Sequence, residues 1–476
     1  MDDEGRRATR RYVLWSAASV ALLALLALDV LWLSASGGAG IAQQRLLGVL
    51  ALVACLYSQT ELRDWHRYYQ ANRERAGCAP LPAYPRDIFG VRFLLDSVRQ
   101  TRANDLLQAR ARALREVGRG HTFVHKLAPE PGFAVSTDEP EVVKAVLATR
   151  FDDWALPRVR QRAFRPVLGR RSIFQTNGPE WQHARAALRP AFVRDNVRDM
   201  ACLDRHIVKL LARVRAAEGA PVDLQVLFAM LTMDSISDFM FGQSTDALGA
   251  AETPDALRFG QCFDRSMYKV ANRARLGWLT QVLPDRELDV DTDFLRRYAA
   301  KYVEEAKRRT HNKEAAAEEG GGSGEKYVFL DDLIRSGEPD EVVRDQLLSI
   351  FLAGRDTTTS VLTFLFAQLA RRPEMAAAIR REIRDLDLGP DPAAGPSWDQ
   401  LRGMTYLNWA VREALRLNPP VATNSREAVR DTVLPTGGGP DGTSPTVVLK
   451  GTILRYQAVS TSKSMTPPFP STTGPD

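Results

Sequence analysis

The chain has 476 residues, 45% of them hydrophobic, so it can bury a sizeable core in one large domain or in several. Its formal charge of +6 comes from 64 basic and 58 acidic residues, which are spread along the chain without a long Lys/Arg run. This distribution argues against nucleic-acid binding and fits better with a basic face that meets anionic lipid or an acidic partner protein.

The first apolar run, Tyr12–Leu33, predicts a membrane anchor. It is as long as a bilayer-spanning helix, about 20 residues, and its single charge, Asp29, lies near its far end. A cleaved signal peptide is the alternative, but the run is long and has no properly flanked Ala-x-Ala site. Four arginines precede the run and would hold that end in the cytosol: Arg6, Arg7, Arg10 and Arg11.

A second, weaker apolar run, Leu46–Tyr57, follows a Gly/Ser break at Ser34–Gly40. It fits either a second span or a helix lying on the membrane surface. We therefore assign residues 1–60 to an N-terminal membrane anchor of one span or two. Residues 61–88 are predicted to be a spacer, because the prolines of Cys78–Pro85 favour a stiff extended chain, although an ordinary loop has the same composition.

The remainder predicts a mainly α fold with a minor β-sheet. Helical periodicity runs from Phe89 to about Lys126, and Phe133–Ser136 and the segment before it look like short strands. Later helices are predicted at Glu139–Leu147, Glu180–Phe192, Val197–Ala217, Leu224–Phe241, Thr292–Arg309 and Tyr406–Leu417. The low-complexity stretch Ala315–Gly324 predicts a flexible surface linker.

Four cysteines, Cys55, Cys78, Cys202 and Cys262, are sparse for this length. None forms a CxxC pair, and their spacing predicts no metal site. Such usage is typical of a reduced, cytosol-facing protein.

The segment Asp345–Arg372 is the most informative. It is apolar on nearly every face, which predicts a core helix, and the charges of Arg355 and Asp356 argue against a third membrane span. Gly354 weakens the helix, and the hydroxyls of Thr357–Thr359 can bond back to carbonyls. The combination predicts a local groove, lined by a hydroxyl and a carboxylate, that suits proton relay to bound dioxygen. A satisfied polar patch in a long helix is the alternative.

The hexapeptide Ala353-Gly-Arg-Asp-Thr-Thr358 resembles the oxygen-activation motif of the cytochromes P450. The resemblance implies that this helix crosses the haem face, with Ala353 against the haem. It also implies that Thr357 steers protons to the oxygen, that Asp356 belongs to the same relay, and that Gly354 leaves room for oxygen.

Two further motifs occur in the order of that family. Trp181-Gln-His-Ala-Arg185 resembles its Trp-x-x-x-Arg helix, which implies that Trp181 and Arg185 bind a haem propionate, and Arg426 resembles the strand arginine at the other propionate. Glu413-Ala-Leu-Arg416 resembles the Glu-x-x-Arg helix. There the ion pair is buried and structural and needs a third partner from a later segment, whereas a lone i,i+3 pair would be an ordinary exposed one.

Three stretches resemble one subgroup of that family, the fungal n-alkane and fatty-acid ω-hydroxylases: Asp223–Phe228, Asp234–Gly242 and Asp431–Gly442. It implies a haem-dependent monooxygenase at the endoplasmic reticulum membrane, with its catalytic domain in the cytosol. The implied partners are an NADPH–cytochrome reductase, the lipid bilayer and a long-chain apolar substrate.

The resemblance stops after Tyr456. Gln457–Asp476 is rich in Ser, Thr and Pro and predicts a disordered tail. The family would continue to Phe-x-x-Gly-x-Arg-x-Cys-x-Gly, and none of the four cysteines has that context, so the axial thiolate is absent. We expect residues 89–456 to be a partial cytochrome P450 domain and the tail to result from a frameshift, retained intron or mis-set exon boundary. The rival interpretation is a truncated membrane protein without catalysis.

Overall fold

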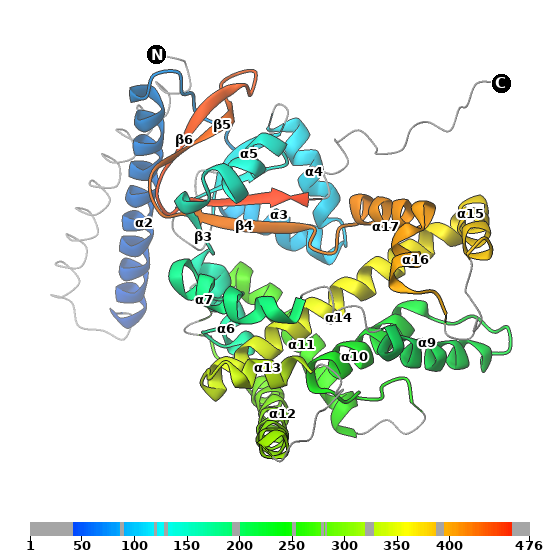
Figure 1. Ribbon diagram of the computed structural model, residues 1–476. Coiled ribbons are helices and arrows are strands. Elements are labelled where there is room, and N and C mark those ends of the chain that lie inside the picture. Colours follow the sequence, from blue (N-terminus) through cyan, green and yellow to red (C-terminus); the bar gives the residue numbers. More distant parts are fainter. Residues whose placement is uncertain are drawn as a thin grey trace, which may run out of the picture. The chain divides into compact units, whose positions relative to one another are not determined.

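The computed structural model describes residues 41–85, 90–118, 121–127, 132–192, 200–249, 254–277, 280, 283–318, 328–386 and 395–458 (Figure 1). Its contacts divide the chain into two compact units. The sheet unit is formed by Met1–Pro157 and Thr423–Gln457, and the helical unit by Arg158–Ala422 with the residues from Ala458. Helices predominate among the described residues, which confirms a mainly α fold with a minor β-sheet.

The sheet unit is built on a five-stranded sheet in the order β1-β2-β7-β4-β3. Its strands are β1 (Thr122–Lys126), β2 (Phe133–Thr137), β3 (Trp154–Ala155), β4 (Thr423–Ala428) and β7 (Ile453–Gln457). β2 and β7 are parallel, with Val135 opposite Leu454, and the other pairs are antiparallel. A separate hairpin consists of β5 (Thr432–Gly438) and β6 (Ser444–Val448). Strands more than 300 residues apart thus form one sheet. The predicted disordered tail begins one residue too early, because Gln457 is buried in β7 and paired with Thr423 of β4.

Aromatic packing holds helix α2 (Ile41–Glu74) on this unit. The ring centroids of Trp65 and Tyr68 lie 4.8 and 5.3 Å from that of Phe133 on β2. The predicted second apolar run, Leu46–Tyr57, is helical and belongs to α2. The predicted anchor, Tyr12–Leu33, lies outside the described residues.

The predicted spacer is part of the packed unit. Its first part, residues 61–74, continues α2. Its proline segment is hydrogen-bonded to the unit: the Ala79 amide donates to the Pro445 carbonyl and the Tyr84 amide to the Val124 carbonyl, both at 2.9 Å, and the Leu81 amide donates to the Tyr68 hydroxyl. The segment is extended, as its prolines predict, but it is docked along its length.

The helix predicted from Phe89 to Lys126 is wrong in its last part. The structure has α3 (Val91–Arg102) and α4 (Leu106–Glu116), separated where Asn104 adopts a φ of 53°. Thr122–Lys126 is strand β1, buried at every position. Pairing with β2 overrides the helical periodicity, because strand preference depends on partners distant in sequence. The predicted helix at Glu139–Leu147 is confirmed as α5 (Pro140–Lys144) and a π-helical turn, Ala145–Thr149.

The helical unit contains the remaining helices. They are α6 (Arg158–Leu168), α7 (Gly178–Leu188), α9 (Met200–Arg215), α10 (Leu224–Phe241), α11 (Pro254–Leu276), α12 (Arg286–Glu318), α13 (Phe329–Arg335), α14 (Asp340–Arg371), α15 (Pro373–Arg384), α16 (Trp398–Gly403) and α17 (Thr405–Leu417). Because α12 extends to Glu318, the beginning of the predicted linker is helical; the rest of that linker, residues 319–324, lies outside the described residues.

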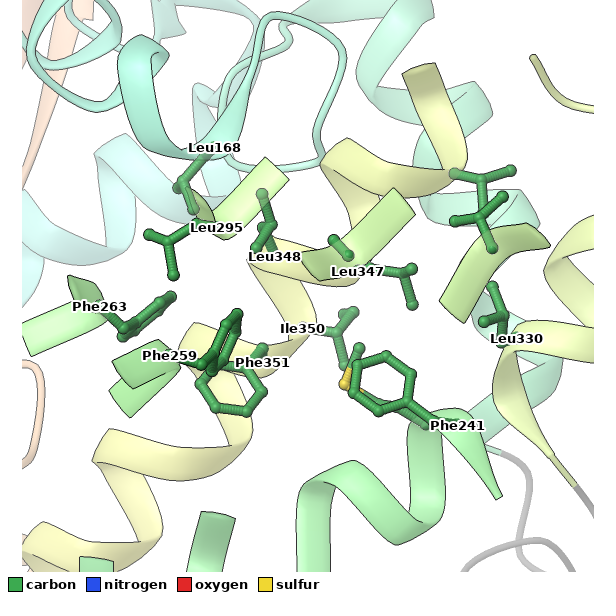
Figure 2. Packing of buried hydrophobic residues seen from close by; sticks show 14 of the residues in the cluster. Leu168, Phe241, Phe259, Phe263, Leu295, Leu330, Leu347, Leu348, Ile350 and Phe351 are labelled. Atoms are coloured by element: carbon green, nitrogen blue, oxygen red, sulfur yellow. The ribbon is translucent and has the colours of Figure 1, made fainter. Parts of the chain in front are cut away.

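The first half of helix α14 lies in the core of the helical unit, as its apolar character predicts, with Asp345–Phe351 buried. After Phe351, the buried residues of α14 are Arg355 and Leu365, so its second half is less buried than predicted. Phe351 of α14 meets the rings of Phe259 and Phe263 of α11 edge-on, at centroid distances of 4.9 and 5.0 Å. Figure 2 shows these three rings together with Leu348 and Leu295. The core therefore fixes α14 and the motif that it carries.

Within the described part of the chain, one helix, α10, has the length and apolar character of a membrane span. Half of it is buried inside the protein, with Phe228, Met240 and Phe241 among its core residues. It is thus a core helix of this unit.

Candidate active site

The residues predicted to relay protons lie on one continuous helix, α14. The Thr357 hydroxyl donates to the Ala353 carbonyl, one turn back, at 2.6 Å. Thr359 and Thr363 make the same contact, at 2.9 and 2.8 Å, to Arg355 and Thr359. A threonine hydroxyl that donates to the i−4 carbonyl has a hydrogen-bond partner, and the helix continues through it. The backbone therefore stays helical through the motif.

Gly354 serves close packing between two helices. A Cβ atom on Gly354 would lie 2.5 Å from Cδ1 and 2.9 Å from Cγ1 of Ile236 on α10. The space that a side chain would take is thus already occupied by Ile236. The expected groove beside this glycine is filled by an isoleucine, and the glycine is needed because α10 approaches α14 so closely.

Asp356 is held by a buried arginine that sequence analysis did not connect to it. Arg355 is 8% exposed, and its guanidinium reaches Asp356 Oδ1 at 3.0 Å and Oδ2 of Asp264, on α11, at 3.1 Å. Asp264 has no motif around it, so only the tertiary structure identifies it. Burial raises the pKa of Asp356 above its ordinary value, and the charge of Arg355 partly opposes that rise.

This arrangement places a carboxyl whose pKa is raised and the hydroxyl of the next residue on the same helix turn. A carboxyl with a raised pKa gives and takes a proton closer to neutral pH than an ordinary aspartate does. Arg355 fixes the carboxyl and balances its charge. Asp356 and Thr357 are bonded to different partners, Arg355 and the Ala353 carbonyl, and their joint role in proton transfer stays a prediction.

The predicted propionate ligands lie on two different units. On α7, the Arg185 guanidinium is 5.4 Å from the Trp181 ring centroid, a cation–π contact that orients the exposed guanidinium. Arg426 lies on β4 of the sheet unit, where its Nη1 donates to the Ser425 carbonyl at 2.9 Å. Trp181, Arg185, Ala353, Asp356 and Thr357 all belong to the helical unit.

Glu413 and Arg416 of α17 form the predicted ion pair. Two hydrogen bonds of 2.7 Å join them, and both side chains are about four-fifths buried, with 20% and 19% exposed. The hydrogen bonds from Arg416 lower the pKa of Glu413. The third partner from a later segment stays a prediction.

The described residues can bind the propionates of a haem, because the exposed guanidinium of Arg185 can form two hydrogen bonds with a carboxylate. The described cysteines do not fit the thiolate side. None of them stands in a Phe-x-x-Gly-x-Arg-x-Cys segment. Cys202 donates to Asp238, and buried Cys262 lies beside Arg265.

Comparison with known proteins gives consistent matches. A sequence profile of the cytochrome P450 family matches residues 88–451. The chain is 35% identical over 437 residues to the cytochrome P450 monooxygenase fsdH of Fusarium heterosporum, covering 90% of this chain and 74% of that protein. It is 35% identical over 410 residues to the cytochrome P450 monooxygenase himC of Aspergillus japonicus, covering 86% and 70%. Identity to cytochrome P450 52A12 of Debaryomyces hansenii is 33% over 394 residues, covering 80% and 74%.

Proposed function

We propose a function from one premise: the chain belongs to the cytochrome P450 family, close to the fungal alkane and fatty-acid hydroxylases. The function is insertion of one oxygen atom from O₂ into a C–H bond of an alkane or fatty acid, near the chain terminus. The second oxygen atom leaves as water, and NADPH supplies the electrons through a membrane-bound reductase. The observation that supports this proposal is the Ala353–Thr358 motif on α14, in which Arg355 holds the Asp356 carboxyl and Thr357 follows it.

The chain's own residues would hold the cofactor and move protons. Haem, when bound, supplies the iron at which dioxygen is activated. Arg185, oriented by Trp181, would bind one propionate, and Arg426 the other. Thr357 would turn its hydroxyl from the Ala353 carbonyl to the oxygen, and Asp356 would return the proton that Thr357 passes on.

The proposed substrate class, alkanes and fatty acids, rests on three sequence stretches in α10 and around β5. Asp223–Phe228 and Asp234–Gly242 form the N-cap and body of α10, and Asp431–Gly442 forms β5 and the turn after it. Their resemblance to the fungal alkane and fatty-acid hydroxylases agrees with the relatives named cytochrome P450 52. A long apolar substrate also suits a protein anchored at the endoplasmic reticulum, since such a molecule partitions into lipid.

The axial thiolate is the component that the 476 residues do not supply in its family context. The experiment therefore uses the chain extended by the cysteine-loop segment of a relative such as fsdH. Titration of this extended chain with lauric acid or hexadecane should shift the haem spectrum as water leaves the iron. A shift only with compact aromatic or steroid ligands would refute the substrate class.

The proton relay is tested in the same extended chain by Thr357→Ala. We expect NADPH consumption to continue while peroxide rises and product falls, because the relay hydroxyl is lost. Thr363→Ala is the matched control, since Thr363 makes the same i−4 hydrogen bond on the same helix outside the motif. Unchanged coupling in Thr357→Ala, or equal uncoupling in both variants, would contradict the assignment.

A further inference from the structure

Three metal-ligand side chains converge between α9 and α10. Cys202 and His206 lie four residues apart on α9, and Asp238 lies on α10. Cys202 Sγ is 2.9 Å and His206 Nε2 is 3.2 Å from Asp238 Oδ2, and the three ligand atoms lie within 4.8 Å of one another. His206 is 2% exposed and Asp238 5% exposed.

We propose that Cys202, His206 and Asp238 bind a zinc ion. Zinc takes thiolate sulfur at about 2.3 Å, imidazole nitrogen at about 2.0–2.1 Å and carboxylate oxygen at about 2.0–2.2 Å, so tetrahedral ligands lie roughly 3–4 Å apart. The three atoms already lie close to that spacing. A mixed sulfur and nitrogen set selects zinc over magnesium or calcium, which prefer oxygen ligands.

The charges of the cluster balance with a divalent cation. A Cys202 thiolate and the Asp238 carboxylate carry two negative charges, and a neutral His206 adds none. Zinc binding replaces the Cys202 thiol proton, which leaves to solvent. Arg205 Nη2 lies 3.0 Å from Asp238 Oδ2 with 55% of its side chain exposed. It can remain on the carboxylate as an outer partner, because a carboxylate has about four acceptor positions.

The burial of the three residues fits a four-coordinate zinc ion that is bound by three side chains and one water molecule. Cys202 is only partly buried, so one side of the cluster is open to solvent for the fourth ligand. Nδ1 of His206 is buried and has no hydrogen-bond partner in the described part of the chain, so the ring is held through Nε2 alone. A zinc ion at Nε2 would fix the ring and join α9 to α10.

The test uses the full-length chain, purified in detergent and freed of metal. Zinc added in competition with a chromophoric chelator should bind at one equivalent. Cobalt added instead should give the near-ultraviolet charge-transfer absorption of a thiolate–cobalt bond. Zinc should also slow alkylation of Cys202, identified by mass spectrometry.

Cys202→Ser should abolish the cobalt band and weaken zinc binding by more than the roughly 10–100-fold effect of losing an outer partner. Cys78→Ser is the matched control, because it removes a similarly half-buried thiol outside the cluster and should change neither measurement. If Cys202→Ser fails to fold, the cobalt band of unaltered and Cys78→Ser chains decides the question. Absence of stoichiometric zinc, or binding unaffected by Cys202→Ser, would overturn the site and leave a hydrogen-bonded network.

Discussion

At the scale of single residues, His125 is an uncharged histidine in an apolar environment. It is 0% exposed on β1, and its ring stacks on Phe93 with centroids 3.7 Å apart. Its Nδ1 lies 2.9 Å from the Lys126 carbonyl. Burial lowers the pKa of His125 to about 3, and the positive charge of Arg455 adds to this effect.

His125 should therefore make the protein less stable in acid. The unfolded chain takes up a proton near pH 6.5, while the folded protein does so only near pH 3. The unfolded state binds more protons between these values, so the free energy of unfolding falls as pH drops, by up to about 1.4 kcal/mol per pH unit.

The measurement is urea unfolding between pH 6.5 and 4.5 for His125→Phe, which keeps an aromatic ring among Phe93 and Phe123. We expect a shallower loss of stability than in the unaltered chain. His311→Phe, at an exposed position, should retain the full slope. Equal slopes in all three proteins would disprove the role of His125.

Two carboxylates, those of Asp264 and Asp356, balance the positive charge of the buried Arg355. Arg355 bonds to both carboxylates, so its charge is balanced within the helical unit. An unpaired charge at a site this buried would be strongly destabilising. The charged centre of α14 is thus stable because α11 supplies Asp264.

At the scale of helices, the close approach of α10 to α14 depends on Gly354. Gly354→Ala would improve helix propensity by up to about 1 kcal/mol. It would also push a methyl group into Ile236, and such overpacking costs about 1–3 kcal/mol. We expect a net loss of unfolding free energy, measured by urea denaturation.

A double-mutant cycle identifies the cause. In an Ile236→Ala background, Gly354→Ala should become neutral or stabilising, because the obstructing atoms are gone. Gly403→Ala, where an added Cβ meets no atom within 4 Å, should not destabilise. An equal cost of Gly354→Ala in both backgrounds would show that Ile236 is not the obstacle.

At the scale of the whole molecule, haem ligation depends on a cysteine in the family context. None of the four cysteines has it. The 476-residue chain, reduced under carbon monoxide, should therefore lack the absorption of thiolate-ligated haem, and the extended chain should show it. A thiolate spectrum from the unextended chain would refute this interpretation of its cysteines.

The membrane anchor is a second property of the whole chain. Because Tyr12–Leu33 has the length and flanking arginines of a span, the expressed protein should remain in the pellet after alkaline carbonate extraction. Replacing Leu22, Leu23 and Leu25 by aspartates should release it, since charges at a bilayer centre are costly. Release of the unaltered chain would contradict the predicted anchor.

The sequence by itself determined the features that depend on neighbouring residues. Helix α10 has the bounds that its periodicity predicts, Leu224–Phe241. Residues at its ends fix these bounds: the Asp223 carboxylate accepts from the amides of Gln225 and Val226, and Gly242 follows the helix with a φ of 75°. The core position of α14 and the Glu413–Arg416 pair follow in the same way from spacing within one helix.

Only the tertiary structure decided the features that join distant segments. Thr122–Lys126 is a strand because β2 and β7 complete the sheet, and β7 lies more than 300 residues further along the chain. The pairing of Arg355 with Asp264, the packing of Ile236 on Gly354, and the meeting of Cys202 and His206 with Asp238 all cross between helices. Local patterns do not encode such contacts, because each depends on how whole elements pack.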